Sequence, residues 1–257
     1  MNKNFLKREK AAAVIITALV LALILGIAGC ELQSDDSNEL TIYPGDPIVC
    51  FGDSLTEGVG AGLIPGLPEK TRSYPAYLQQ KIKVKVVNAG VSGETSEDAL
   101  DRLDDDVISK SPQAVIVLLG ANDLFGKRAA ADTKTDIQTI ITSLKAEGCK
   151  IFLASFIGDE DWEESVLEAV ANPPSYLASQ YPPGYADALV ALFPDYKQMF
   201  VELQAIDGIE FIPDIWTGVW GSHMSDPIHP DSAGYKIMAD NIFNKIKPYL
   251  LENNLVR

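Results

Sequence analysis

The chain has 257 residues, of which 47% are hydrophobic and 22% are charged, and this composition excludes a disordered, collagen-like or low-complexity protein. Its 36 acidic residues outnumber its 21 Lys and Arg residues, which gives a net charge of −15. A field of that sign repels polyanions and therefore argues against nucleic acid as a partner.

The N-terminal segment has the form of an export signal. Lys and Arg residues near the start are followed by an uninterrupted apolar run from Ala11 to Gly29, which stops at Cys30. The run ends in Ile27-Ala28-Gly29-Cys30, which resembles a bacterial lipobox, where the cysteine is lipidated and cleavage occurs before it. We therefore predict a lipoprotein signal peptide over 1–29, lipidation of Cys30, and an exported cell-envelope membrane lipoprotein that faces the periplasm or the exterior.

An uncleaved helix is the alternative for this segment, because the apolar run is just long enough to span a bilayer. Both interpretations leave the basic residues inside and the folded part outside. Removal of 1–29 takes away four Lys and Arg residues and Glu9, so the net charge becomes 17 − 35 = −18. A chain this acidic does not adhere electrostatically to anionic headgroups, and it accommodates a neutral or cationic substrate more easily.

A polar, acidic segment follows the cysteine. From Glu31 to Gly45 we find no apolar periodicity. We therefore predict a flexible acidic tether over 30–46 and a folded domain over 47–257.

The predicted domain alternates between strand-like and helix-like segments. Short apolar runs rich in β-branched residues are predicted as strands: Ile48 to Phe51, Val84 to Val87, Ala114 to Leu119, Ile151 to Phe156 and Ile209 to Ile212. Helical spacing is found in Ser73 to Ile82, Ser96 to Ser109, Thr133 to Ala146, Ala186 to Ala205 and Ser232 to Leu250. This alternation predicts an α/β domain in which helices cover both faces of a parallel sheet.

Two cysteines remain besides Cys30. Cys50 falls near the end of one predicted strand and Cys149 at the beginning of another. In a parallel sheet these positions lie at opposite edges, so we predict two buried free thiols rather than a disulfide.

Three polar blocks each follow a predicted strand: Gly52-Asp53-Ser54-Leu55, Asn88-Ala89-Gly90-Val91-Ser92-Gly93 and Gly120-Ala121-Asn122-Asp123. In a parallel sheet the residues after each strand gather at one edge, and ligands bind there near the switch in strand order. A fourth block, Asp226-Pro227-Ile228-His229-Pro230, leads into the last predicted helix.

These blocks contain the parts of a serine nucleophile. A serine hydroxyl needs a base within hydrogen-bond reach, and the chain offers only His223 and His229. Only His229 has a carboxylate three residues before it, which is Asp226. We therefore predict Ser54 as nucleophile, His229 as general base and Asp226 as the residue that orients it.

Acyl transfer also requires donors aimed at the developing oxyanion. The backbone N–H groups of Ser54 and Gly93 and the side-chain amide of Asn122 are the candidates. Glycine suits its position because the absence of a side chain lets the amide approach a substrate closely.

The order Ser54, Gly93, Asn122 and then Asp226-x-x-His229 resembles that of the SGNH (GDSL-type) hydrolase superfamily, and the likeness extends from Ile48 to about Tyr249. It is nearest to the bacterial thioesterase, lysophospholipase and arylesterase subgroup. The resemblance implies a flavodoxin-like three-layer α/β/α sandwich with about five parallel strands. It also implies a serine esterase, acting on carboxylic esters through an acyl-enzyme, that needs no metal and no organic cofactor. We expect a monomer.

The chain departs from this subgroup in two places. Pro227 stands where the subgroup often has glycine, and the segment 158–194 is longer and richer in proline and aromatic residues. We interpret 158–194 as a lid or as one wall of an acyl or sugar pocket, and a surface insertion packed on itself is the alternative. The substrate therefore stays open among small-molecule, lipid and glycan esters, including O-acetyl groups of envelope or extracellular polysaccharides.

Other classes of site compete with this interpretation. Asp53, Asp123, Asp226 and His229 could together ligate a metal, and the acidic run from Asp159 to Glu164 could bind calcium. An α/β-hydrolase elbow is excluded because Thr56 stands where that motif requires glycine. A lipoprotein that binds glycans or a partner protein without turnover is the alternative of a different functional class.

Overall fold

The structure is a computed structural model that describes residues 31–34, 40–62, 69–172, 179 and 181–257. The predicted signal peptide and Cys30 lie outside the described residues. The chain divides into two units, 1–46 and 47–257.

The first unit contains a pair of short strands where the sequence predicted a segment without secondary structure. Strand β1 (Glu31–Ser34) pairs antiparallel with β2 (Leu40–Tyr43). The physical reason lies in Leu40-Thr41-Ile42-Tyr43, a run of β-prone residues whose signal was outweighed by the acidic residues before it. A two-stranded hairpin is marginally stable by itself, so the role of 30–46 as a tether stays a prediction.

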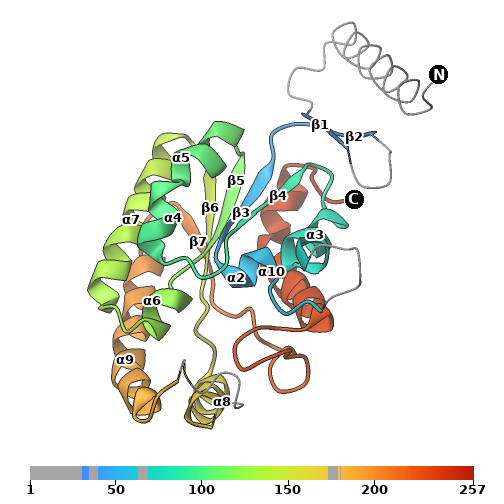
Figure 1. The fold of residues 1–257 in the computed structure, drawn as a ribbon. Coiled ribbons are helices and arrows are strands. Elements are labelled where there is room, and N and C mark those ends of the chain that lie inside the picture. Colours follow the sequence, from blue (N-terminus) through green and yellow to red (C-terminus); the bar gives the residue numbers. More distant parts are fainter. Residues whose placement is uncertain (1–30, 35–39, 63–68, 173–178, 180) are drawn as a thin grey trace, which may run out of the picture. The chain divides into compact units, whose positions relative to one another are not determined.

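The second unit is built on a five-stranded parallel sheet (Figure 1). Its strands, in spatial order, are β4 (Val86–Gly90), β3 (Ile48–Gly52), β5 (Ala114–Leu118), β6 (Lys150–Ala154) and β7 (Ile209–Ile212). The first strand of the domain therefore lies between the second and the third, which is the flavodoxin-like order. The predicted fold class is confirmed, and the switch in strand order falls at the carboxyl ends of β3 and β5.

Helices cover both faces of this sheet (Figure 1). On one face α3 (Tyr74–Gln79) packs against α10 (Ser232–Glu252), and on the other α7 (Ala130–Ala146) packs against α4 (Ser96–Asp101) and α9 (Tyr185–Gln204). The other helices among the described residues are α2 (Ser54–Glu57), α5 (Leu103–Asp106), α6 (Ala121–Phe125) and α8 (Glu160–Ala171), with 3-10 turns at Glu69–Arg72 and Ile108–Lys110.

Two of the predicted elements whose bounds differ from the structure bear on the site. The second strand runs over Val86–Gly90 rather than 84–87, because Asn88 and Gly90 pair in register with Cys50 and Gly52 of β3. The helix predicted over 96–109 is broken after Asp101, since the backbone of Arg102 leaves helical geometry. Asn88, Ala89 and Gly90, which were predicted to follow the strand, therefore belong to β4.

The central strands form the core. All five residues of β3 and all five of β5 are buried, as two-sided coverage of a parallel sheet requires. Cys50 is buried within β3, whereas Cys149 is only partly buried, and both are free thiols.

In the described part of the chain, no helix combines the length and apolar character that crossing a bilayer demands. The apolar run from Ala11 to Gly29 lies outside that part.

Candidate active site

Ser54 begins α2 directly after β3, at the switch in strand order. The turn between them is tight, because a Cβ on Gly52 would lie 2.4 Å from the Leu118 carbonyl oxygen and 2.2 Å from Thr56 Oγ1. Asp53 caps the short helix by accepting a hydrogen bond from the N–H of Leu55 at 3.0 Å. The nucleophile predicted from the sequence therefore sits at the carboxyl edge of the sheet.

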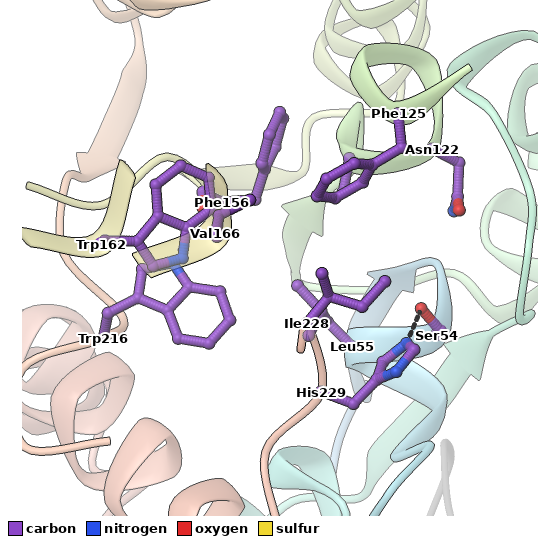
Figure 2. Close-up of a pocket in the computed structure, with 11 residues that line it drawn as sticks. Ser54, Leu55, Asn122, Phe125, Phe156, Trp162, Val166, Trp216, Ile228 and His229 are labelled. Atoms are coloured by element: carbon purple, nitrogen blue, oxygen red, sulfur yellow. Dashed lines mark hydrogen bonds between the residues drawn. The ribbon is translucent and has the colours of Figure 1, made fainter. Parts of the chain in front are cut away.

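The structure brings Ser54, His229 and Asp226 together in one hydrogen-bonded series. Ser54 Oγ lies 2.9 Å from His229 Nε2 (Figure 2), and His229 Nδ1 lies 2.8 Å from Asp226 Oδ2. This geometry fits an imidazole whose Nδ1–H donates to the carboxylate while Nε2 accepts from the serine hydroxyl.

The second oxygen of Asp226 is fixed by the backbone of its own loop. Asp226 Oδ1 accepts the N–H groups of Ile228 at 2.9 Å and of His229 at 2.8 Å. Partial burial acts to raise the pKa of Asp226, but the hydrogen bond and charge of His229 and these two N–H donors lower it below its usual value. The carboxylate is therefore ionised at neutral pH and oriented at the same time.

Further hydrogen bonds hold the loop itself. The carbonyl oxygen of His229 accepts from the N–H and the hydroxyl of Ser225, at 2.9 Å and 3.1 Å. Asp231 then caps α10 by accepting the N–H of Gly234 at 2.8 Å. The other histidine, His223, lies 3.9 Å from Asp231 Oδ2, beyond hydrogen-bond distance, so His229 is the histidine joined to both serine and carboxylate.

Of the three residues predicted to supply oxyanion donors, two line one pocket and the third does not. Ser54 and Asn122 line the same pocket, and Asn122 Nδ2 donates one hydrogen bond to the carbonyl of Glu94 at 2.8 Å, which leaves its second N–H. Gly93 follows β4 in the left-handed region, with φ of 84°, and is not among the residues that line the pocket. Its role as a donor stays a prediction.

Arg102 is a positioning residue that the sequence did not reveal. Its side chain donates to the carbonyl oxygens of Gly52 and Ala89, each at 3.0 Å, and so joins the ends of β3 and β4. It also pairs with Glu94 at 2.6 Å and lies over the Phe51 ring. Arg102 lies within the helix predicted over 96–109, and nothing in that pattern indicates its contacts with the two strand ends.

The metal interpretation finds no support in the positions of its ligands. Asp123 is fully buried and accepts hydrogen bonds from the backbone and hydroxyl of Ser96, from Arg128 and from Thr133. Its oxygens are thus occupied by donors rather than turned toward His229. Among the described residues, no three His, Cys, Asp or Glu side chains gather in a way that could hold a metal ion.

Asp53 is a buried carboxyl group next to Ser54. Its Oδ2 has no hydrogen-bond partner in the described part of the chain. Burial raises its pKa to about 7, against the lowering effects of the Leu55 N–H and of the His229 charge, while the charge of Asp123 raises it further. Asp53 therefore changes its protonation state near neutral pH.

An apolar pocket opens beside Ser54 and His229 (Figure 2) and encloses about 360 Å³ of space, part of it open to solvent. Its lining is Ser54, Leu55, Ala121, Asn122, Phe125, Phe156, Trp162, Val166, Trp216, Ile228 and His229. Trp162 and Val166 come from α8, so part of the predicted lid segment 158–194 contributes to a wall, while 173–178 and 180 lie outside the described residues. Phe125, Phe156 and Trp216 were not predicted from the sequence, because an aromatic residue after a strand has no distinctive pattern.

A serine, a histidine and an aspartate bonded in series at the switch point of a flavodoxin-like sheet define a class of enzymes that hydrolyse ester bonds. The GDSL-like lipase/acylhydrolase family matches residues 50–237, and the chain belongs to this family. The family predicted from the order of the motifs is thereby confirmed.

Known proteins similar to this chain include esterases. This chain is 24% identical over 208 residues to esterase TesA of Pseudomonas aeruginosa. The aligned residues are 79% of this chain and 89% of that protein. A crystal structure of TesA is 25% identical, with a TM-score of 0.57, and covers 79% of this chain and 99% of the other. Over 114 residues, which are 41% of this chain and 40% of the relative, it is 29% identical to YqeF, an uncharacterized lipoprotein of Bacillus subtilis.

Proposed function

We propose that the chain is a serine esterase that hydrolyses carboxylic esters through an acyl-enzyme, in the manner of an arylesterase, lysophospholipase or thioesterase. The observation that carries the proposal is the unbroken hydrogen-bonded series from Ser54 through His229 to Asp226 at the edge of an apolar pocket. An ionised, doubly anchored Asp226 is what such a base requires, since it stabilises the imidazolium that forms during the reaction.

In the first step Ser54 Oγ attacks the ester carbonyl carbon, and its proton passes to His229 Nε2. The carbonyl oxygen becomes an oxyanion that accepts hydrogen bonds from the N–H groups of Ser54 and Gly93 and from Asn122 Nδ2. When the tetrahedral intermediate collapses, His229 gives its proton to the leaving alcohol or thiol. The acyl group is then bonded to Ser54.

In the second step water takes the place of the alcohol. His229 Nε2 accepts a proton from the water, whose oxygen attacks the acyl carbon, and the same oxyanion donors act again. Collapse returns the proton to Ser54 Oγ and releases the carboxylic acid. These steps use only side-chain and backbone groups of this chain and one water molecule.

The proposed site of action is the outer face of a cell-envelope membrane, with a lipid on Cys30. The lipobox-like Ile27-Ala28-Gly29-Cys30 supports this, and so does the likeness over part of the chain to a lipoprotein of Bacillus subtilis. The intact mass of the native protein tests it. A mass of residues 30–257 plus a lipid is expected, and retention of Met1 to Gly29 would reject lipidation at Cys30.

Hydrolysis of a nitrophenyl ester with a short acyl chain tests the proposed function. Replacement of Ser54 by Ala should abolish hydrolysis while leaving the fold intact, because the small side chain fits where serine stood. Ser109→Ala, which removes an exposed hydroxyl outside the site, is the matched control and should keep full activity. Equal rates for the wild type and Ser54→Ala would reject both the nucleophile and the acyl-enzyme.

A further inference from the structure

The pocket beside Ser54 has a polar end and an aromatic end (Figure 2). Ser54 and His229 stand at one end, while Phe125, Leu55 and Ile228 line its middle. At the opposite end stand Phe156, Trp162, Val166 and Trp216. A group bonded to Ser54 Oγ that extends into this pocket therefore leaves a polar environment and runs toward aromatic rings.

The aromatic end is held in place by ring contacts. Trp162 is only 3% exposed, and its ring centroid lies 5.9 Å from that of Phe193, 6.1 Å from that of Trp216 and 6.2 Å from that of Trp220. Trp216 is in turn fixed by its indole N–H, which donates to the carbonyl oxygen of Phe156 at 2.8 Å. Rings packed on several sides in this way form a wall rather than a gate.

The indole nitrogen of Trp162 distinguishes it from Trp216. Within the described residues, Trp162 Nε1 is buried and has no hydrogen-bond partner. A buried donor without an acceptor is unfavourable, so hydrogen bonding does not explain a tryptophan here. What the residue contributes is the volume of its ring at the closed end of the pocket.

We propose that Trp162 sets the acyl-chain length that the enzyme accepts, by closing the end of the pocket opposite Ser54. The inference rests on the proposed function, since it assigns the pocket to the acyl part of the ester. Each methylene that the pocket buries should raise kcat/KM by about fourfold, until the chain reaches the tryptophan ring. Phe156, Val166 and Trp216 line the same end, so a long acyl chain meets packed side chains there. The enzyme therefore prefers short acyl chains to long fatty acyl chains.

A series of nitrophenyl esters from acetate to dodecanoate tests the proposal with full-length protein. The wild type should be most active on butyrate or hexanoate and much less active on octanoate and longer esters. Trp162→Ala opens the closed end, so the ratio of kcat/KM for octanoate to that for acetate should rise at least about tenfold. Hydrolysis of acetate should change little, because its acyl group does not reach the ring.

Two further variants separate pocket length from loss of folding. Val166→Ala removes a smaller part of the same wall, one turn further along α8, and should shift the ratio in the same direction by about threefold. Trp220→Ala is the matched control, because the Trp220 ring contacts that of Trp162 and does not line the pocket. It should leave the ratio unchanged, and thermal unfolding of all variants measures any general destabilisation.

The outcomes are distinguishable from failure of the proposed function. If no ester is hydrolysed, or if Ser54→Ala retains activity, the proposed function fails. If the wild type is an esterase that depends on Ser54 and the octanoate ratio of Trp162→Ala and Val166→Ala equals that of Trp220→Ala, only the role of Trp162 is overturned.

Discussion

The polar and apolar sides of the site are held by different forces. Asp226 and His229 are fixed by directional hydrogen bonds between 2.8 and 2.9 Å long, to each other, to Ser54 and to their own backbone. Trp162 is fixed by contacts among rings, and its own donor is unpaired within the described residues. A change of atom type breaks a directional hydrogen bond, whereas a smaller side chain in a packed wall leaves empty space there at a cost in stability. We therefore expect substitutions on the polar side to affect rate and those on the apolar side to affect substrate preference.

Asp226→Asn should have the largest effect on kcat/KM, because it replaces one carboxylate oxygen on the polar side by an NH₂ group. The amide oxygen would keep the bonds from Ile228 and His229, and the NH₂ group would then face His229 Nδ1. This favours the imidazole tautomer with hydrogen on Nε2, which cannot accept the Ser54 proton. A fall in kcat/KM of about a thousandfold or more is expected, measured on nitrophenyl butyrate.

Asp98→Asn is the matched control for this substitution. Asp98 also accepts a backbone N–H, from Thr95 at 3.0 Å, but it contacts no histidine. Its replacement should change kcat/KM by less than about threefold. A similar small change in both variants would show that Asp226 does not orient the base.

Arg102→Lys should have an intermediate effect that appears in both rate and stability. A lysine cannot donate to the Gly52 and Ala89 carbonyls and to Glu94 at once. The ends of β3 and β4 would separate, so kcat should fall about tenfold with little change in KM, and urea unfolding should show a loss of about 2–4 kcal/mol.

The exposed ion pair between Lys134 and Glu202, 2.6 Å apart, provides the comparison. Lys134→Ala should cost less than about 1 kcal/mol and leave kcat unchanged, because pairs in water contribute little. If Arg102→Lys also costs less than about 1 kcal/mol and leaves kcat unchanged, Arg102 does not position the strand ends.

Asp53→Asn should have the smallest effect on rate, and its signature is a dependence of stability on pH. The folded protein retains the Asp53 proton up to about pH 7, whereas the unfolded chain releases it near the ordinary pKa of 3.8. Asp53 therefore makes the wild type less stable as the pH rises from about 4 to about 7, with no further change above that range.

The stability of Asp53→Asn relative to the wild type should thus increase across this range, by up to about 4 kcal/mol. Urea unfolding at pH values from 4 to 8 measures the difference. Asp104→Asn, at the exposed start of α5, should give a constant difference over the same range. A constant difference for Asp53→Asn would mean that its carboxyl group is not buried in the folded state.

The polar side of the site was predictable from the sequence because its chemistry has few solutions. Only two histidines are present, and only His229 has an aspartate three residues before it. The alternation of strands and helices likewise predicted the layers, since strands and helices each have their own period of apolar residues. The end of β4 was not predictable, because a polar residue such as Asn88 does not indicate a strand. Its place in the sheet depends on pairing with Cys50 of β3.

The apolar side was predictable only as a region. The aromatic residues of 158–194 suggested a pocket wall, yet Trp216 and Phe156 join it from other parts of the chain. Contacts between residues that are distant in sequence leave no period or spacing. Arg102 was missed for the same reason, since its partners Gly52 and Ala89 belong to two different strands.

The burial of Cys50 in the central strand β3 makes its thiol a probe of unfolding. Burial raises the pKa of this thiol well above its usual range, so almost no reactive thiolate forms while the sheet is intact. Cys149 is only partly buried and is open to reagents through smaller local motions. Alkylation of Cys149 therefore reports local opening, whereas alkylation of Cys50 counts each event in which the whole sheet comes apart.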